Sequence, residues 1–134
     1  MFLDEASMAW HSKKQSRIEN SVVGSKSIAM RTALETVQGI RHEFRMMGVP
    51  LNNPVCIHGD NMSVTHNMSK PESTLKKKAN SVCFHYIREA AAADECRTGH
   101  ISTHENPADI ATKPLPAGEK RDYLVRTLLY FFSE

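Results

Sequence analysis

Two aspartates, Asp60 and Asp109, occupy positions at which a carboxylate could take part in chemistry. Asp60 comes just after a short β-rich run, "PVCIH" (54–58), so we expect it at the carboxyl edge of a sheet, where α/β folds usually bind ligands. Asp109 lies in "HENPADIATKPLP" (104–116), after the next predicted strand. Two carboxylates at one edge suit Mg²⁺, a hard cation that prefers oxygen ligands. Spacing alone leaves open that Asp60 is only a helix N-cap and Asp109 only a surface residue.

The pattern of apolar residues predicts the elements that would position these aspartates. The segment "MFLDEASMAWHS" (1–12) predicts a hairpin, and residues 21–48 have the spacing of a long helix that ends at Gly48. Trp10 is expected to close the core of the sheet. Further strands are predicted at 54–58 and 95–104, helices at 60–68, 80–94, 105–112 and 117–132, and a polar loop at 69–78. This alternation predicts an α/β fold in which helices pack on a mixed sheet.

Length and composition indicate one globular domain over residues 1–134, with a terminal amphipathic helix at 117–132. The chain is 40% hydrophobic and 24% charged, and its net charge of +2 does not mark it as a nucleic-acid binder. No run approaches the roughly 18 apolar residues of a membrane span, so no membrane partner is expected. Cys56, Cys83 and Cys96 lack zinc-site spacing and are expected to be free thiols inside the cell, with Cys56 and Cys83 as small core residues.

Basic residues are nevertheless clustered in two places. The clusters are Lys13, Lys14 and Arg17, and Lys76, Lys77 and Lys78. Each cluster could contact the phosphates of a nucleic acid or could form a solvated face, and the sequence leaves both interpretations open.

The histidines give weaker signals. His58 and His66 flank Asp60, but no third ligand at metal-site spacing accompanies them. His85 is expected to pack or to form a hydrogen bond rather than to act in catalysis.

Four motifs together resemble the ribonuclease H-like region at the end of the polyprotein of copia-type long-terminal-repeat retrotransposons. They occur in the order of that family and extend over nearly the whole chain. The motifs are "SMAWHSKKQ" (7–15), "GDNMSVTHNM" (59–68), "CFHYIRE" (83–89) and "PADIATKPLP" (107–116).

The resemblance implies a ribonuclease H-like mixed sheet flanked by helices, and cleavage of the RNA strand of an RNA–DNA hybrid by two Mg²⁺ or Mn²⁺ ions. The family uses four carboxylates, and Asp60 and Asp109 match the third and fourth. The position of the helix glutamate falls in "VVGSKSIAM" (22–30) and is held by Lys26. The aspartate of the first strand would precede Met1, so that strand is expected to be missing. In related cellular enzymes a histidine near the position of His104 assists product release; a loop histidine with no task is the alternative.

We therefore hypothesise a decayed or truncated copy that keeps most of the fold and has weak or no hydrolytic activity. The resemblance implies an RNA–DNA hybrid or another nucleic acid as partner, an ancestral link to an upstream reverse transcriptase, and a location in the cytoplasm, a virus-like particle or the nucleus. The alternative is a non-catalytic nucleic-acid-binding or interaction module that remained after the element decayed. A third hypothesis is an open reading frame without function.

Overall fold

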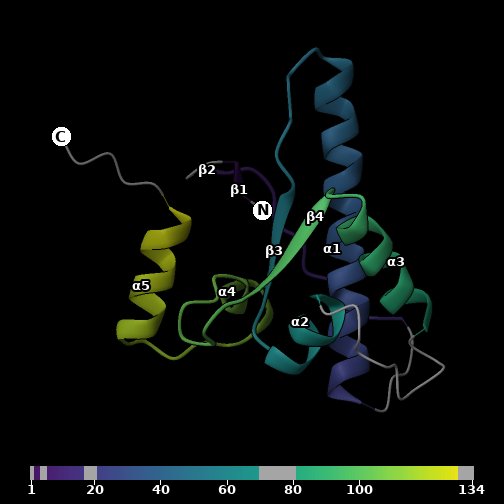
Figure 1. The fold of residues 1–134 in the computed structure, drawn as a ribbon. Coiled ribbons are helices and arrows are strands. Elements are labelled where there is room, and N and C mark those ends of the chain that lie inside the picture. The colour runs from purple at the N-terminus through teal and green to yellow at the C-terminus, as the bar shows by residue number, and fades with distance from the viewer. Residues whose placement is uncertain (1, 4–5, 17–20, 70–80, 130–134) are drawn as a thin grey trace. The chain divides into compact units, whose positions relative to one another are not determined.

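The computed structural model describes residues 2–3, 6–16, 21–69 and 81–129, which form helices and short strands (Figure 1). The elements in chain order are β1 (Phe2–Leu3), β2 (Ala6–Ser7), α1 (Val22–Met46), β3 (Val55–Gly59), α2 (Met62–Ser69), α3 (Ser81–Ala92), β4 (Cys96–His100), α4 (Ala108–Thr112) and α5 (Glu119–Leu128). The chain divides into two compact units, one of Arg17–His100 and one of Met1–Ser16 with Ile101–Glu134. The expectation of a single domain stays a prediction.

The larger unit is built around the parallel strands β3 and β4, whose register runs from Val55 opposite Cys96 to Gly59 opposite His100. Helices α1 and α3 lie on the same side of this strand pair (Figure 1). Their apolar faces enclose a core that includes Leu34, Ile57, Val64, Phe84, Ile87 and Cys96. Burial of these side chains is the main force holding the unit together, at about 25 cal/mol per Å² of apolar surface.

Among the described residues of the larger unit, helices cover one side of β3, and this corrects one prediction from the sequence. Ile57 is buried against the helices, whereas Cys56 is exposed. Successive side chains of a strand point to opposite faces, so a strand with helices on one face cannot bury both residues. The expectation that Cys56 is a core residue is therefore wrong, and the same expectation for Cys83, which lies buried in α3, is confirmed.

The long helix predicted at 21–48 is confirmed as α1, and both of its ends have local causes. The Ser21 hydroxyl accepts a hydrogen bond from the Gly24 N–H at 3.0 Å, which is an N-cap. At the other end Gly48 has φ +78°, its N–H donates to the Arg45 carbonyl, and the Val49 N–H donates to the Phe44 carbonyl. This is a Schellman motif, which favours glycine at its left-handed position.

The smaller unit contains the predicted hairpin, with β1 and β2 paired antiparallel and Phe2 opposite Ser7. Its predicted turn, Asp4 and Glu5, lies outside the described residues. Trp10 does not close a core: its side chain is 82% exposed, because β2 ends at Ser7 and residues 8–16 form no regular element. That prediction is wrong.

The strands that the structure describes form two separate two-stranded sheets rather than one mixed sheet. The α/β class is confirmed, whereas the ribonuclease H-like arrangement and the missing first strand stay predictions. The predicted elements at 95–104 and 105–112 are shorter than expected, as β4 (Cys96–His100) and α4 (Ala108–Thr112). The predicted loop at 69–78 lies almost wholly outside the described residues. Among the helices described, none has both the length and the apolar character needed to cross a membrane.

Candidate metal-binding aspartates

Asp60 lies at the carboxyl end of β3, as predicted, and faces a cation. The Lys26 ammonium, on the second turn of α1, donates to the Asp60 carboxylate with an Nζ–Oδ1 distance of 2.6 Å. The Lys26 side chain is 35% exposed and the Asp60 side chain 20% exposed, so solvent reaches the pair. The position that the resemblance gives to a metal-binding glutamate is thus held by a cation that contacts the candidate metal-binding aspartate.

A glycine allows the helices to approach the end of this strand. A Cβ added at Gly59 would lie 3.2 Å from the Met30 Cε of α1 and 3.3 Å from the Thr65 Cγ2 of α2. Both contacts are tighter than ordinary van der Waals packing, so the absence of a side chain at Gly59 keeps α1 and α2 close to the strand end. This packing brings Lys26 to Asp60.

The N-cap of α2 is not Asp60. The neighbouring Asn61 provides the cap, because its Oδ1 accepts from the Val64 N–H at 3.2 Å and its carbonyl accepts from the Thr65 N–H at 3.1 Å. The alternative that Asp60 serves only as a helix cap is therefore wrong. Its carboxylate is used in the ion pair with Lys26.

Asp109 is buried rather than on the surface, and both of its carboxylate oxygens contact lysines. Its side chain is 3% exposed; the Lys113 Nζ lies 2.7 Å from Oδ1 and the Lys120 Nζ lies 2.9 Å from Oδ2. Lys113 follows one turn later on the chain, whereas Lys120 belongs to α5. Asp109 therefore joins α4 to α5, and the alternative of a surface aspartate is wrong.

The two lysines decide the ionisation of Asp109. Burial on its own raises the pKa of a carboxyl group, because it disfavours the charged form. The hydrogen bonds and positive charges of Lys113 and Lys120 outweigh this effect, so the pKa of Asp109 lies below its ordinary value. Asp109 is a carboxylate at neutral pH, and its charge is already compensated.

These residues, as arranged, do not fit a divalent cation. An ammonium nitrogen lies within 3 Å of an oxygen of each aspartate, at the place where a metal ligand bond would form. Among the described residues, no group of three or more His, Cys, Asp or Glu side chains could hold a metal ion. Asp60 belongs to the larger unit and Asp109 to the smaller one, so their convergence at one edge stays a prediction.

The histidines near these aspartates do not add ligands. His58 and His66 are both exposed, and the His58 ring lies over the backbone of Gly99, where an added Cβ would be 2.9 Å from its Cδ2.

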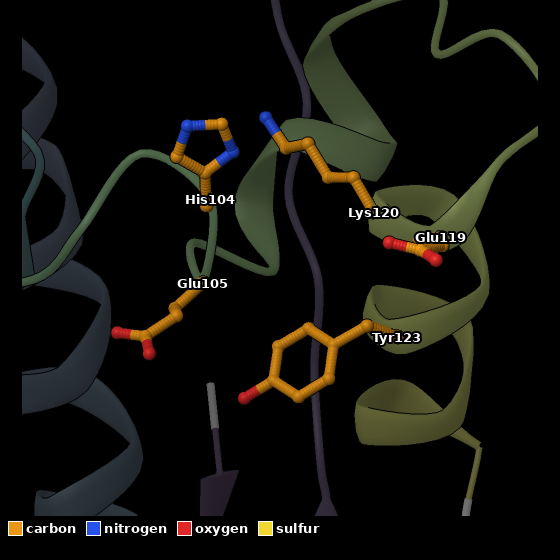
Figure 2. A pocket seen from close by; sticks show the side chains of 5 residues that line it. All are labelled: His104, Glu105, Glu119, Lys120 and Tyr123. Carbon is orange, nitrogen blue, oxygen red and sulfur yellow. The ribbon is translucent and has the colours of Figure 1, made fainter.

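His104 and Glu105 form one wall of a surface pocket of about 390 Å³, and Glu119, Lys120 and Tyr123 of α5 form the other (Figure 2). The pocket brings together side chains of both charges.

The lysine partners of Asp109 were not among the predicted site residues. Asp109 lies on the helix predicted at 105–112 and Lys113 follows that helix directly, and their spacing of four residues is a local signal for the pair. Nothing local marks Lys120, because its contact depends on how α5 packs on α4. Of the predicted basic clusters, Lys13 and Lys14 are exposed, and Arg17 and Lys76 to Lys78 lie outside the described residues.

Comparison with known proteins gives an origin for the chain. It is 28% identical over 115 residues to the retrovirus-related Pol polyproteins from transposons RE2 and RE1 of Arabidopsis thaliana. The chain resembles retrotransposon Pol polyproteins. The match covers 86% of this chain but only 8% of each relative, so the chain spans a small part of their length. No family model and no solved structure matches. The similarity supports an origin in a retrotransposon polyprotein.

Proposed function

We propose that this chain is a ribonuclease H-like domain of copia-type descent, whose two-metal centre has been replaced by lysine–aspartate pairs and which does not cleave RNA–DNA hybrids. Its descent is supported by the four motifs in family order and by the similarity to Pol polyproteins. The parallel pair of β3 and β4, covered by helices, is compatible with it. In the intact polyprotein such a domain would act on the hybrid left by the reverse transcriptase region.

The proposed loss of hydrolysis rests on one observation. The Lys26 Nζ lies 2.6 Å from the Asp60 Oδ1. Two-metal hydrolysis needs carboxylates that hold one ion to activate water and a second to stabilise the leaving oxygen. Here one carboxylate position carries a positive charge, and that charge neutralises the neighbouring aspartate. A divalent ion at Asp60 would have to displace the ammonium and then remain beside it.

Asp109 supports the same conclusion independently. Its oxygens already accept hydrogen bonds from Lys113 and Lys120 in a buried position, so a metal would compete with two charge-assisted bonds. Removing these bonds would also break the ion pair that joins α4 to α5. The present role of Asp109 is therefore to hold two helices together.

The test is incubation of the purified chain with a labelled RNA–DNA hybrid in Mg²⁺ and, separately, in Mn²⁺. We expect the chain to bind the hybrid at low salt without cleaving it in either ion. Turnover that disappears in Asp60→Asn would refute the proposal, because it would show that Asp60 still supports catalysis. A cellular ribonuclease H under the same conditions controls for the hybrid and the ions.

A second candidate function, nucleic-acid binding without any link to hydrolysis, is favoured by a separate observation. Lys13 and Lys14 are exposed on the same irregular segment as the exposed Trp10. Binding of this kind would need no divalent ion and would weaken as salt rises. Dependence on Lys13 and Lys14 rather than on Asp60 would distinguish it from the ancestral activity.

A further inference from the structure

We propose that residues 8–16, here called the tryptophan–lysine segment, form a contact site for single-stranded nucleic acid. In this site Trp10 stacks on an unpaired base, and Lys13 and Lys14 bind the adjoining phosphates. The inference rests on the part of the proposed function in which the chain binds nucleic acid. It does not depend on hydrolysis or on a metal.

The exposure of the Trp10 side chain is the first observation that supports the proposal. Its side chain is 82% exposed, the most exposed among the large hydrophobic side chains of the described residues. A tryptophan side chain combines a large apolar ring with a polar N–H, and tryptophan is enriched where proteins meet other molecules. The flat ring presents a π-face of the kind on which a nucleobase stacks.

The positive charge of the tryptophan–lysine segment indicates that its partner is negatively charged. Residues 8–16 contain Lys13 and Lys14 and no acidic residue. Both lysines are exposed, and neither takes part in an ion pair among the described residues. An exposed aromatic ring on the same short segment as two exposed lysines matches a base attached to a phosphate, whereas a purely apolar partner would make no use of the lysine charges.

The spacing fits a short stretch of single strand. Three residues of chain reach at most about 11 Å, so the Lys13 and Trp10 backbones lie within the span of a few nucleotides. Ser12, between them, donates from its hydroxyl to the Ala111 carbonyl at 2.9 Å, which attaches the segment to α4. This attachment reduces the entropy that binding must remove from the segment.

Single strands are preferred over duplexes for a physical reason. Stacking on an exposed ring needs a base whose face is free, and in a duplex the faces are covered by neighbouring base pairs. Stacking of one base on an aromatic side chain contributes about 1 to 3 kcal/mol, or about 5- to 150-fold in affinity. Each phosphate contact adds about 0.7 to the slope of log affinity against log salt for a single strand.

The experiment uses the full chain and an oligothymidylate. The chain has one tryptophan, so its intrinsic fluorescence reports on Trp10 alone. We expect the oligonucleotide to quench this fluorescence at low salt. With a labelled oligonucleotide, Trp10→Ala should weaken binding by about 5- to 150-fold, and Trp10→Phe should recover much of the loss. The double variant Lys13→Gln, Lys14→Gln should reduce the salt slope by about 1.4.

Matched controls lie in the other unit. Val82→Ala removes an exposed apolar side chain, and Arg45→Gln removes an exposed charge; neither should change affinity or salt slope as the segment variants do. If the RNA–DNA hybrid binds but the oligothymidylate neither binds nor quenches, this inference fails and the proposed function stands. If neither nucleic acid binds, both fail. If Trp10→Ala instead abolishes self-association in sedimentation while no oligonucleotide binds, the segment contacts a second copy, which also overturns the inference.

Discussion

Replacing Lys26 with glutamate should create a divalent-cation site beside Asp60. In the chain as it is, the ammonium lies 2.6 Å from the carboxylate and compensates its charge. In Lys26→Glu, a carboxylate on α1 faces the Asp60 carboxylate at the end of β3. The charge next to Asp60 changes from positive to negative. Two facing carboxylates without a cation repel each other and therefore favour an added Mg²⁺ or Mn²⁺.

The size of the effect follows from Coulomb's law. A unit charge about 4 Å from another contributes about 1 kcal/mol in water, so a divalent ion beside an ammonium is disfavoured by about 2 kcal/mol. Replacing this repulsion with an equal attraction changes the binding free energy by about 4 kcal/mol, or about a thousandfold in Kd. The dielectric constant of water applies because both side chains are partly exposed, at 35% and 20%. Salt will reduce the effect further.

The assay is titration calorimetry with Mn²⁺ and Mg²⁺ at low ionic strength. We expect no measurable heat of binding for the unaltered chain, a clear isotherm for Lys26→Glu, and an intermediate result for Lys26→Gln, which removes the cation without adding a ligand. Circular dichroism checks that each variant is folded. The reasoning is refuted if the unaltered chain binds as tightly as Lys26→Glu, or if adding Asp60→Asn to Lys26→Glu leaves the affinity unchanged.

Three further predictions concern stability. Asp109→Asn should lower the free energy of unfolding in urea by about 1 to 3 kcal/mol, because the buried negative charge is lost and an amide NH2 donor replaces one of the two acceptor oxygens that contact lysines. Asp94→Asn, in an exposed pair, should change the free energy of unfolding by less than about 1 kcal/mol. The pKa of Asp109 is lowered in the folded chain, so its stabilising contribution is complete above the ordinary carboxyl pKa of about 3.9 and is lost as pH falls toward the lowered value. Urea midpoints measured from pH 6 downward should fall less steeply for Asp109→Asn; equal slopes would contradict the assignment. Gly59→Ala should cost about 1 kcal/mol or more, because its Cβ meets the Met30 and Thr65 side chains, and a neutral result would show that α1 and α2 can move aside.

The parts of the fold with local causes could be predicted from the sequence. The serine cap at Ser21, the apolar spacing that follows it and the left-handed glycine at Gly48 define α1 without reference to other elements. The β-rich runs at β3 and β4 were also visible, and their parallel pairing follows from the helices between them.

What could not be predicted depends on contacts between distant residues. The sequence around Trp10 resembles a strand that enters a core, but β2 ends before it and the ring remains exposed. Cys56 lies in an apolar run, and only the coverage of β3 on one face decides that it is exposed. The candidate aspartates were found from their places after strands, whereas the contact of Lys120 with Asp109 requires the packing of α5 on α4.

The two aspartates differ in how readily a metal site could be created at them. Asp60 is partly exposed and contacts one lysine, so a single substitution removes the competing charge. Asp109 is buried and contacts two lysines, Lys113 just after α4 and Lys120 in α5, and replacing either one leaves the other in place. Charge reversal at Lys26 should therefore allow ion binding without allowing hydrolysis, because a two-metal reaction needs both ions. If a Lys26→Glu chain binds Mn²⁺ but does not cleave the hybrid, the lack of hydrolysis has a cause other than the ion pair between Lys26 and Asp60.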